Sequence, residues 1–322
     1  RLLYMALTLW LVSVVAFVLI QLPPGDYAET YLTEKQQSGA AVSQEELANM
    51  PKLLGIDRPL HEQYLSWAAG IVLRGDFGYS FEWRRPVTEV IGERLPLTLA
   101  LAFCTLAFMY AVSLPIGIYS AVRQYSVGDY IVTFIGFIGI AVPSFLLALV
   151  MMYFGFAYFN TNIGGLFSEE FVDAPWSLAR AWDLAKHLPL PALILGLGGS
   201  AQLIRIMRAN LLDELRKPYV ITARAKGLPE WRVVFKYPVR VALNPFISTL
   251  GYLFPYIVSG SIIVSLVLSL PTVGPLLLKA LIAQDMFLAG TIVLLLGVMT
   301  VVGTLISDLL LMWIDPRIRM EG

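Results

Sequence analysis

Long apolar runs, separated by shorter polar or charged stretches, dominate the chain. Six of them reach the roughly 20 residues that a helix needs to cross the hydrocarbon core of a bilayer, at about 1.5 Å rise per residue. They cover residues 2–22, 96–122, 130–158, 189–208, 243–270 and 286–313. The pattern predicts an all-α integral membrane protein with six transmembrane helices. The first, within residues 1–22, is expected to stay as an anchor, and the other five form a core at 96–313.

Prolines and glycines inside these runs predict irregular helices. Pro115 and Pro143 predict bends in the second and third helices, where neighbouring groups satisfy the freed carbonyls. Gly198 and Gly199 predict close helix approach in the fourth. Residues 271–275, which begin and end with proline, predict a re-entrant or turn-like connection before the last helix.

The distribution of charge predicts the orientation. Residues 205–240 carry nine Lys or Arg against three Asp or Glu, whereas residues 23–95 carry eleven acidic and seven basic residues. Short basic loops stay on the cytoplasmic side of a membrane. We therefore expect a cytoplasmic loop at 209–240, both termini and a tail at 314–322 in the cytoplasm, and 23–95 outside as an extracytoplasmic segment that leans on the membrane helices.

Composition narrows the function. Hydrophobic residues make up 57% of the chain and charged residues 14%, where a soluble domain has roughly a quarter charged, and mean hydropathy is +0.71. One cysteine and two separated histidines give no disulfide and no metal-ligand spacing. The sequence has no Gly-x-x-x-x-Gly-Lys-Ser/Thr phosphate loop and no catalytic constellation. We expect no catalysis and no cofactor on this chain, and a charge asymmetry that reflects topology instead of nucleic-acid binding.

The basic segment contains a second pattern. Its core, Pro218 to Leu228, predicts a short helix that Gly227 stops. Such a helix suits docking to a soluble partner. A basic loop held by anionic lipid headgroups also explains the charge, but it does not explain the alternating alanines and glycine.

From Tyr219 the chain reads Tyr-Val-Ile-Thr-Ala-Arg-Ala-Lys-Gly-Leu, which resembles the cytoplasmic loop of permease subunits of bacterial ABC importers, in the dipeptide/oligopeptide branch. Ile221 stands in place of the acid of the general pattern, and Pro238 replaces a small residue near the start of the fifth helix. Four further stretches resemble the same branch in the expected order: residues 54–64, 74–80, 93–99 and 314–319. Together they identify the chain as a B-type permease subunit with the type I importer fold.

The resemblance implies an assembly in the bacterial inner (plasma) membrane. It comprises a second homologous permease, two ATPase subunits that carry ATP and Mg, and an extracytoplasmic solute-binding protein that docks on 23–95 and 271–285. The short helix then couples the ATPases to the spans: its small residues let it seat closely, and Arg224 and Lys226 pair with acidic groups of the ATPase. The implied coupling residues are Tyr219, Thr222, Ala223, Arg224, Ala225, Lys226, Gly227 and Leu228.

Candidate pathway residues are fewer. Asp308 is the acidic group inside a predicted span, and it is either a pathway group or a helix-contact carboxylate. Pro143 with Ser144 marks a kink at the pathway or a packing kink, and Gln202 lies near the inner end of the fourth helix. The expected substrates are peptides, with oligosaccharides, nickel chelates and glutathione as alternatives. A secondary transporter or channel, the alternative class, predicts ion-coordinating residues and an internal repeat, and the sequence has neither.

Overall fold

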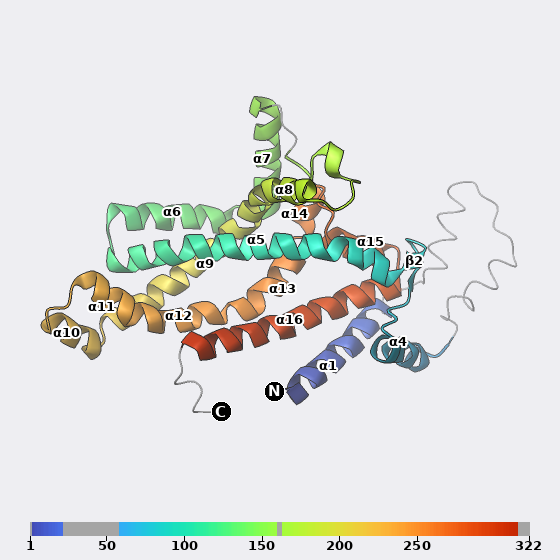
Figure 1. Ribbon diagram of the computed structural model, residues 1–322, viewed down its shortest axis with the longest axis horizontal. Helices are drawn as coiled ribbons and strands as arrows, with labels where there is room; N and C mark the ends of the chain where they lie inside the picture. The colour runs from blue at the N-terminus through green and yellow to red at the C-terminus, as the bar shows by residue number, and fades with distance from the viewer. Residues whose placement is uncertain (1, 22–57, 160–162, 315–322) are drawn as a thin grey trace, which may run out of the picture. The chain divides into compact units, whose positions relative to one another are not determined.

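The computed structural model describes residues 2–21, 58–159 and 163–314, and these are mostly helical (Figure 1). The chain forms two compact units, the first from residues 1–98 and 272–299 and the second from 99–271 and 300–322. Residues 23–57 of the expected extracytoplasmic segment and residues 315–322 of the expected tail lie outside the described residues. The all-α prediction is confirmed.

The first unit pairs the start of the chain with the loop before its last helix. Its elements are α1 (Leu2–Gln21), α4 (Leu60–Arg74), β1 (Tyr79–Ser80), β2 (Arg85–Pro86), the start of α5 (Val87–Val122), α15 (Val273–Ile282) and the start of α16 (Met286–Ile314). Helix α4 is amphipathic, with Trp67 buried and Leu65 and Val72 exposed. It packs on α1 through rings of Phe17 and Tyr64 with centroids 5.5 Å apart, and the Ser13 hydroxyl lies 2.8 Å from that of Tyr64.

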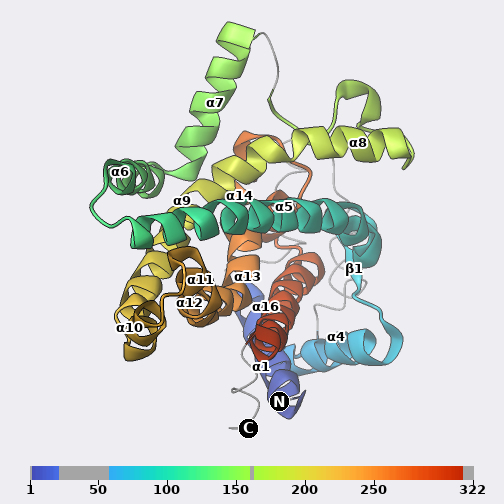
Figure 2. The ribbon, with the colours of Figure 1, turned by 60° about the vertical axis from the view of Figure 1, so that its left-hand side comes forward.

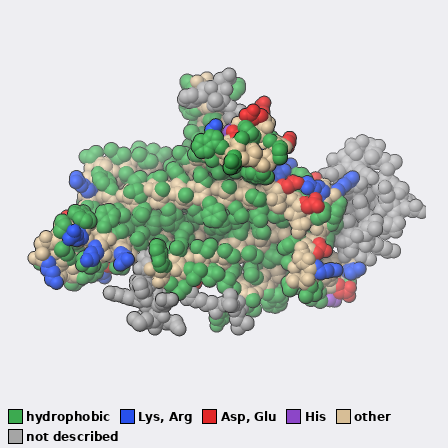
Figure 3. Space-filling view, in the orientation of Figure 1, with side chains coloured by type: hydrophobic (Ala, Val, Ile, Leu, Met, Phe, Trp, Pro, Cys, Tyr) green, Lys and Arg blue, Asp and Glu red, His purple; other side chains and the backbone are tan. Residues whose placement is uncertain are grey.

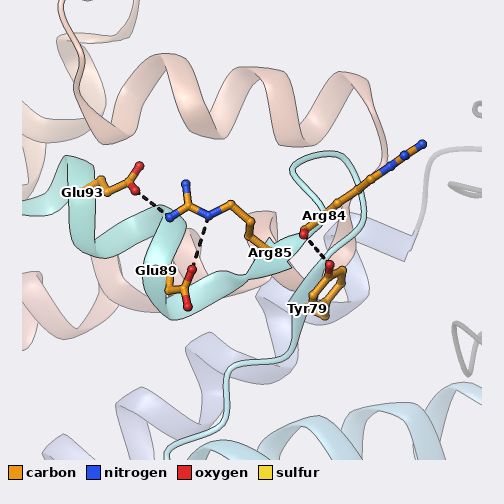
Figure 4. A network of polar contacts seen from close by, with 5 residues as sticks. All are labelled: Tyr79, Arg84, Arg85, Glu89 and Glu93. Atoms are coloured by element: carbon orange, nitrogen blue, oxygen red, sulfur yellow. Dashed lines mark hydrogen bonds and ion pairs between the residues drawn. The ribbon is translucent and has the colours of Figure 1, made fainter. Parts of the chain in front are cut away.

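The antiparallel strands β1 and β2 form a hairpin that leads directly into α5 (Figure 4). Arg85 contacts two carboxylates on the first turns of α5, Glu89 at 3.3 Å and Glu93 at 2.7 Å. Across the hairpin the Tyr79 hydroxyl donates to the carbonyl of Arg84. Because Arg85 and both its carboxylates are exposed, these pairs contribute little stability; they fix the direction in which the hairpin meets the helix.

Asp285 joins this hairpin to the start of α16. Its carboxylate is fully buried and accepts hydrogen bonds from the Ser80 hydroxyl at 2.5 Å and from the backbone N–H of Glu82 at 3.2 Å. The other oxygen accepts from the N–H of Leu288 at 3.2 Å, in the first turn of α16. Burial raises the pKa of Asp285 above its ordinary value, although the hydrogen bonds oppose the shift. Segments 205 residues apart are thereby fastened together.

The second unit contains the remaining helices. They are the rest of α5 and α16, α6 (Val127–Ala141), α7 (Ser144–Phe159), the short η1 (Glu169–Phe171), α8 (Leu178–His187), α9 (Pro189–Leu215), α10 (Pro218–Ala225), α11 (Glu230–Lys236), α12 (Pro238–Ser248), α13 (Leu250–Gly260) and α14 (Ile262–Val267). Their exposed sides are largely hydrophobic, whereas Lys and Arg gather over α10 and α11 (Figure 3).

The bend that Pro143 predicts in the third run is present, because the chain at 130–158 forms two helices; the single span stays a prediction. Helices α6 and α7 meet at a bend of 99° (Figure 1). The residue before a proline avoids the helical region, and Val142 is extended, with φ −87° and ψ 120°. The carbonyl of Pro143 then accepts from the N–H of Leu147 at 3.1 Å, which starts α7. By contrast, α5 continues through Pro115 without interruption.

Close helix approach at the glycines of α9 is confirmed. A methyl group on Gly199 would lie 2.3 Å from the terminal carbon of Met109 on α5, and one on Gly196 would lie 2.8 Å from the Phe108 ring. A β-carbon at either position would force the Met109 or Phe108 side chain to shift, so the glycines let the two helices lie this near each other. Helix α9 also continues to Leu215, beyond the limit expected at residue 208.

The fifth run, expected as one span at 243–270, contains a candidate span at Leu250–Val267, which comprises α13 and α14. Helix α12 begins at Pro238, as the departure at that position suggested, and separate helices α13 and α14 follow. Among the described residues, four helices are long and apolar enough to span a membrane, and a fifth span results if α6 and α7 count as one. The exact number of six stays a prediction.

The raised pKa of Asp285 predicts a pH effect on stability. The protonated carboxyl of Asp285 stabilises the folded state. This contribution to the free energy of unfolding is fully present below the ordinary aspartate pKa of about 4, and it is lost as pH rises through the raised pKa of the folded state. Asp285→Asn cannot ionise, so its melting temperature should depend less on pH above about 4 than that of the parent chain. Thermal unfolding in detergent, followed by tryptophan fluorescence, measures this. Asp76→Asn, an exposed carboxyl of the same unit, is the control; if Asp285→Asn parallels the parent, the buried site does not titrate as described.

Candidate functional site

Helices α10 and α11 form a compact hairpin at the end of α9 (Figure 2). Extended Lys217, with φ −70° and ψ 147°, precedes Pro218 at the first turn of α10, the position where a proline costs no hydrogen bond. Gly227, with φ +73°, ends the helix, and Pro229 is the N-cap of α11. The short helix stopped by a glycine is confirmed. We call residues 218–236 the α10–α11 hairpin.

An apolar cluster holds the two helices of the hairpin together. Val220 and Ala223 of α10 and Val233 of α11 are buried, and Leu228 of the connection packs on them. Two of the expected coupling residues, Ala223 and Leu228, therefore serve the fold of the hairpin. The hairpin has a core of its own, so it can move as one body.

Arg224 is paired within the hairpin. Its guanidinium donates to the Glu230 carboxylate at 2.6 and 3.1 Å, a bidentate contact. That hydrogen bond holds the pKa of Glu230 below its ordinary value. Both side chains are about half exposed, so the pair stabilises the hairpin only weakly. Because Arg224 is already paired with Glu230, it is less available to an acidic group of a partner.

Tyr219 ties the hairpin to α9. Its hydroxyl donates to Glu214 near the end of α9, and its ring lies 6.5 Å from that of Tyr237. Burial, together with the Glu214 carboxylate, raises the pKa of Tyr219. Tyr219 thereby joins the hairpin to the long helix α9.

The exposed surface of the hairpin contains the remaining expected residues. They are Thr222, Ala225, Lys226 and Gly227. Sequence reasoning missed three exposed apolar side chains beside them: Ile221 on α10 is 59% exposed, and Trp231 and Phe235 on α11 are 63% and 58% exposed. Trp231 and Phe235 are four residues apart and so share one face of α11. Contiguous exposed apolar residues mark interaction sites.

Three of the four candidate pathway residues lie together. Pro143, Ser144 and Gln202 line one pocket of about 590 Å³, in which Met109 of α5 and Tyr256 of α13 also take part. Asp308 does not line this pocket. The α6–α7 break contributes irregular backbone to the wall, where a membrane protein tolerates it.

Within the described residues no group of three or more His, Cys, Asp or Glu could hold a metal ion. His187 lies 3.6 Å from Asp183, one turn earlier on α8, and Cys104 is half-buried in α5.

Comparison with known proteins decides the family. Residues 113–320 match the family described as binding-protein-dependent transport system inner membrane component, and residues 1–102 match the N-terminal component of the same systems. The chain belongs to this permease family. As a member it is a multi-pass protein of the inner membrane and a translocation subunit, with the all-α architecture of type I importers.

Two curated relatives of this permease are peptide transporter components. The oligopeptide transport system permease protein AppB of Bacillus subtilis is 34% identical over 309 residues, covering 96% of this chain and 94% of that protein. The dipeptide transport system permease protein DppB of Escherichia coli is 30% identical over 324 residues, covering 96% of this chain and 94% of that protein. The dipeptide/oligopeptide resemblance is thus confirmed.

The division of the permease's hairpin into buried and exposed alanines predicts different outcomes at adjacent positions. Ala223→Leu overfills the cluster with Val220 and Val233 and should cost about 1–3 kcal/mol of local stability, whereas Ala225→Leu on the exposed side should cost little. Hydrogen–deuterium exchange across residues 218–236 in the detergent-solubilised chain measures this. Equal protection in the two variants would contradict the described packing.

Proposed function

We propose that this permease is the non-catalytic, membrane-spanning subunit of an ATP-driven importer of di- and oligopeptides. ATP and Mg bind separate ATPase subunits, and a solute-binding protein delivers the peptide. The absence of a phosphate loop in the sequence supports the first point. The names of AppB and DppB support the peptide substrate.

The α10–α11 hairpin is the proposed contact with an ATPase subunit. The observation that carries this role is a small helical body with its own core that presents Ile221, Ala225 and Lys226 to solvent. An aromatic pair on α11, Trp231 and Phe235, adds apolar area, and aromatic side chains are the usual anchors of protein interfaces. Because Tyr219 is bonded to Glu214, displacement of the hairpin is passed to α9.

The orientation follows from the same contact. The ATPases work in the cytoplasm, so the basic segment 205–240 faces it, in agreement with the positive-inside rule. Both termini are then cytoplasmic. The β1–β2 hairpin and the α15–α16 loop lie outside, fastened by Asp285, and offer a docking surface for the binding protein.

The pocket beside the α6–α7 break is the proposed contribution of this subunit to the pathway. A second, homologous permease completes the passage. Ser144 and Gln202 supply neutral polar groups, and Arg205 one positive charge, in an otherwise mainly apolar wall. Neutral hydrogen-bonding groups suit peptides of varied side chain, which the binding protein has already selected.

The docking role predicts the effect of adding bulk to the exposed side of α10. Ala225→Trp should reduce co-purification of the ATPase subunits and ATP-coupled uptake by about tenfold or more, because an interface that loses about 1.4 kcal/mol binds tenfold more weakly. Membrane insertion should be unchanged. Ala185→Trp, on exposed α8, is the matched control for co-purification. Full ATPase retention by Ala225→Trp would refute the docking role.

The pathway assignment predicts a contrast between two polar residues. Gln202→Leu removes a polar group of the pocket and should lower peptide uptake several-fold, while Asp308→Asn, outside the pocket, should change it little. Uptake of labelled peptide into proteoliposomes with the assembled importer measures both. Complete loss in Asp308→Asn with normal uptake in Gln202→Leu would place the pathway elsewhere.

A further inference from the structure

A second groove lies between α6 and α9, with a volume of about 320 Å³. Small and apolar side chains form most of its wall, and two arginines complete it. Its lining includes Val132 and Gly136 of α6 and Ala201, Ile204, Arg205 and Arg208 of α9. The groove therefore combines a surface for hydrocarbon with a source of positive charge.

The groove is bounded by two fixed contacts between the helices. At one end α6 and α9 nearly touch: a methyl group on Gly136 would lie 3.4 Å from the β-carbon of Ala201. At the other end the Arg208 guanidinium lies 2.9 Å from the buried carboxylate of Asp129, which also accepts from the Tyr125 N–H at 2.9 Å. The space between these contacts is part of the fold.

The charges of the groove do not cancel. Asp129 offsets Arg208, which leaves the charge of Arg205 as a net excess of one. The Arg205 guanidinium lies 4.6 Å from the centroid of the Phe137 ring, and no hydrogen bond or ion pair to Arg205 is present among the described residues. Stacking on a ring leaves the in-plane N–H groups of a guanidinium free to donate. In the part of the chain that the structure describes, the buried Nε of Arg208 also has no hydrogen-bond partner.

These arginines lie near the polar connection between α5 and α6, where a lipid headgroup would reach them. Residues 123–126 form the polar connection between α5 and α6, and the bond from Tyr125 to Asp129 sets Arg208 beside it. Arg205 lies about one turn before Arg208 in α9, about 4.5 Å farther from this connection at 1.5 Å per residue. Long cationic side chains at this level reach toward the phosphate layer.

We propose that this groove is a binding site for one anionic phospholipid. The phosphodiester accepts hydrogen bonds from Arg205, and an acyl chain lies along Val132, Gly136 and Ile204. Charge complementarity selects an anionic over a zwitterionic lipid, and the apolar wall selects a lipid over free phosphate. The bound lipid strengthens the contact between α6, which leads into the break, and α9, which leads to the hairpin. The site depends on the membrane location alone, not on the proposed coupling role.

Native mass spectrometry of the delipidated full chain tests the site. We expect the chain to bind phosphatidylglycerol more tightly than phosphatidylcholine with the same acyl chains, and inorganic phosphate not to compete. Arg205→Gln keeps the Arg208–Asp129 pair and should weaken phosphatidylglycerol binding about tenfold, the loss expected for charge-assisted hydrogen bonds. Ala209→Trp, which fills the groove and keeps both arginines, should weaken it as well.

Arg216→Gln is the matched control, because Arg216 is exposed at the end of α9 and lies outside the groove. It should bind phosphatidylglycerol like the parent chain. Equal binding by Arg205→Gln and the parent, equal losses in Arg205→Gln and Arg216→Gln, or displacement of the lipid by inorganic phosphate would each overturn the proposal. So would altered peptide uptake in Arg205→Gln with unchanged lipid binding, which would assign Arg205 to the larger pocket that it also lines.

Discussion

Backbone hydrogen bonding orders the helices of this permease. In hydrocarbon an unpaired N–H or C=O finds no water, so a chain stays helical unless it lines a cavity or is buried in protein. Helix α5 stays helical through Pro115, whereas the chain leaves the helical conformation at Val142 and Pro143. That departure coincides with the wall of the 590 Å³ pocket. The irregular backbone at the proline therefore lies where the chain lines a cavity.

The α10–α11 hairpin resolves two opposing demands on a short helix. A helix of eight residues is too short to be stable alone, yet a docking element must keep part of its surface free. Val220 and Ala223 give one side of α10 to the contact with Val233, and Ala225 and Lys226 remain exposed. Ala223 thus packs in the core of the hairpin and Ala225 stays accessible to a partner, although in the sequence the two alanines look alike.

Local features were predictable from the sequence, and long-range contacts were not. The Gly227 stop and the break at Pro143 follow from the conformations open to single residues, so both were foreseen. The bidentate bond of Arg224 to Glu230 depends on the turn between two helices, and charge alone indicated an external partner. For Asp308, the rarity of charge inside a span gave no information on which helix face meets the pocket.

Two buried carboxylates explain how a chain with so little charge fastens its helix ends. Asp129 and Asp285 each accept a backbone N–H and a serine hydroxyl, so each offsets the desolvation cost with hydrogen bonds. Asp129 also has a cation, Arg208, whereas the donors to Asp285 are all neutral. A carboxylate without a cation favours protonation, which is the direction of the shift at Asp285. The ion pair with Asp129 neutralises Arg208, so Arg205 remains as the unbalanced charge of the α6–α9 groove.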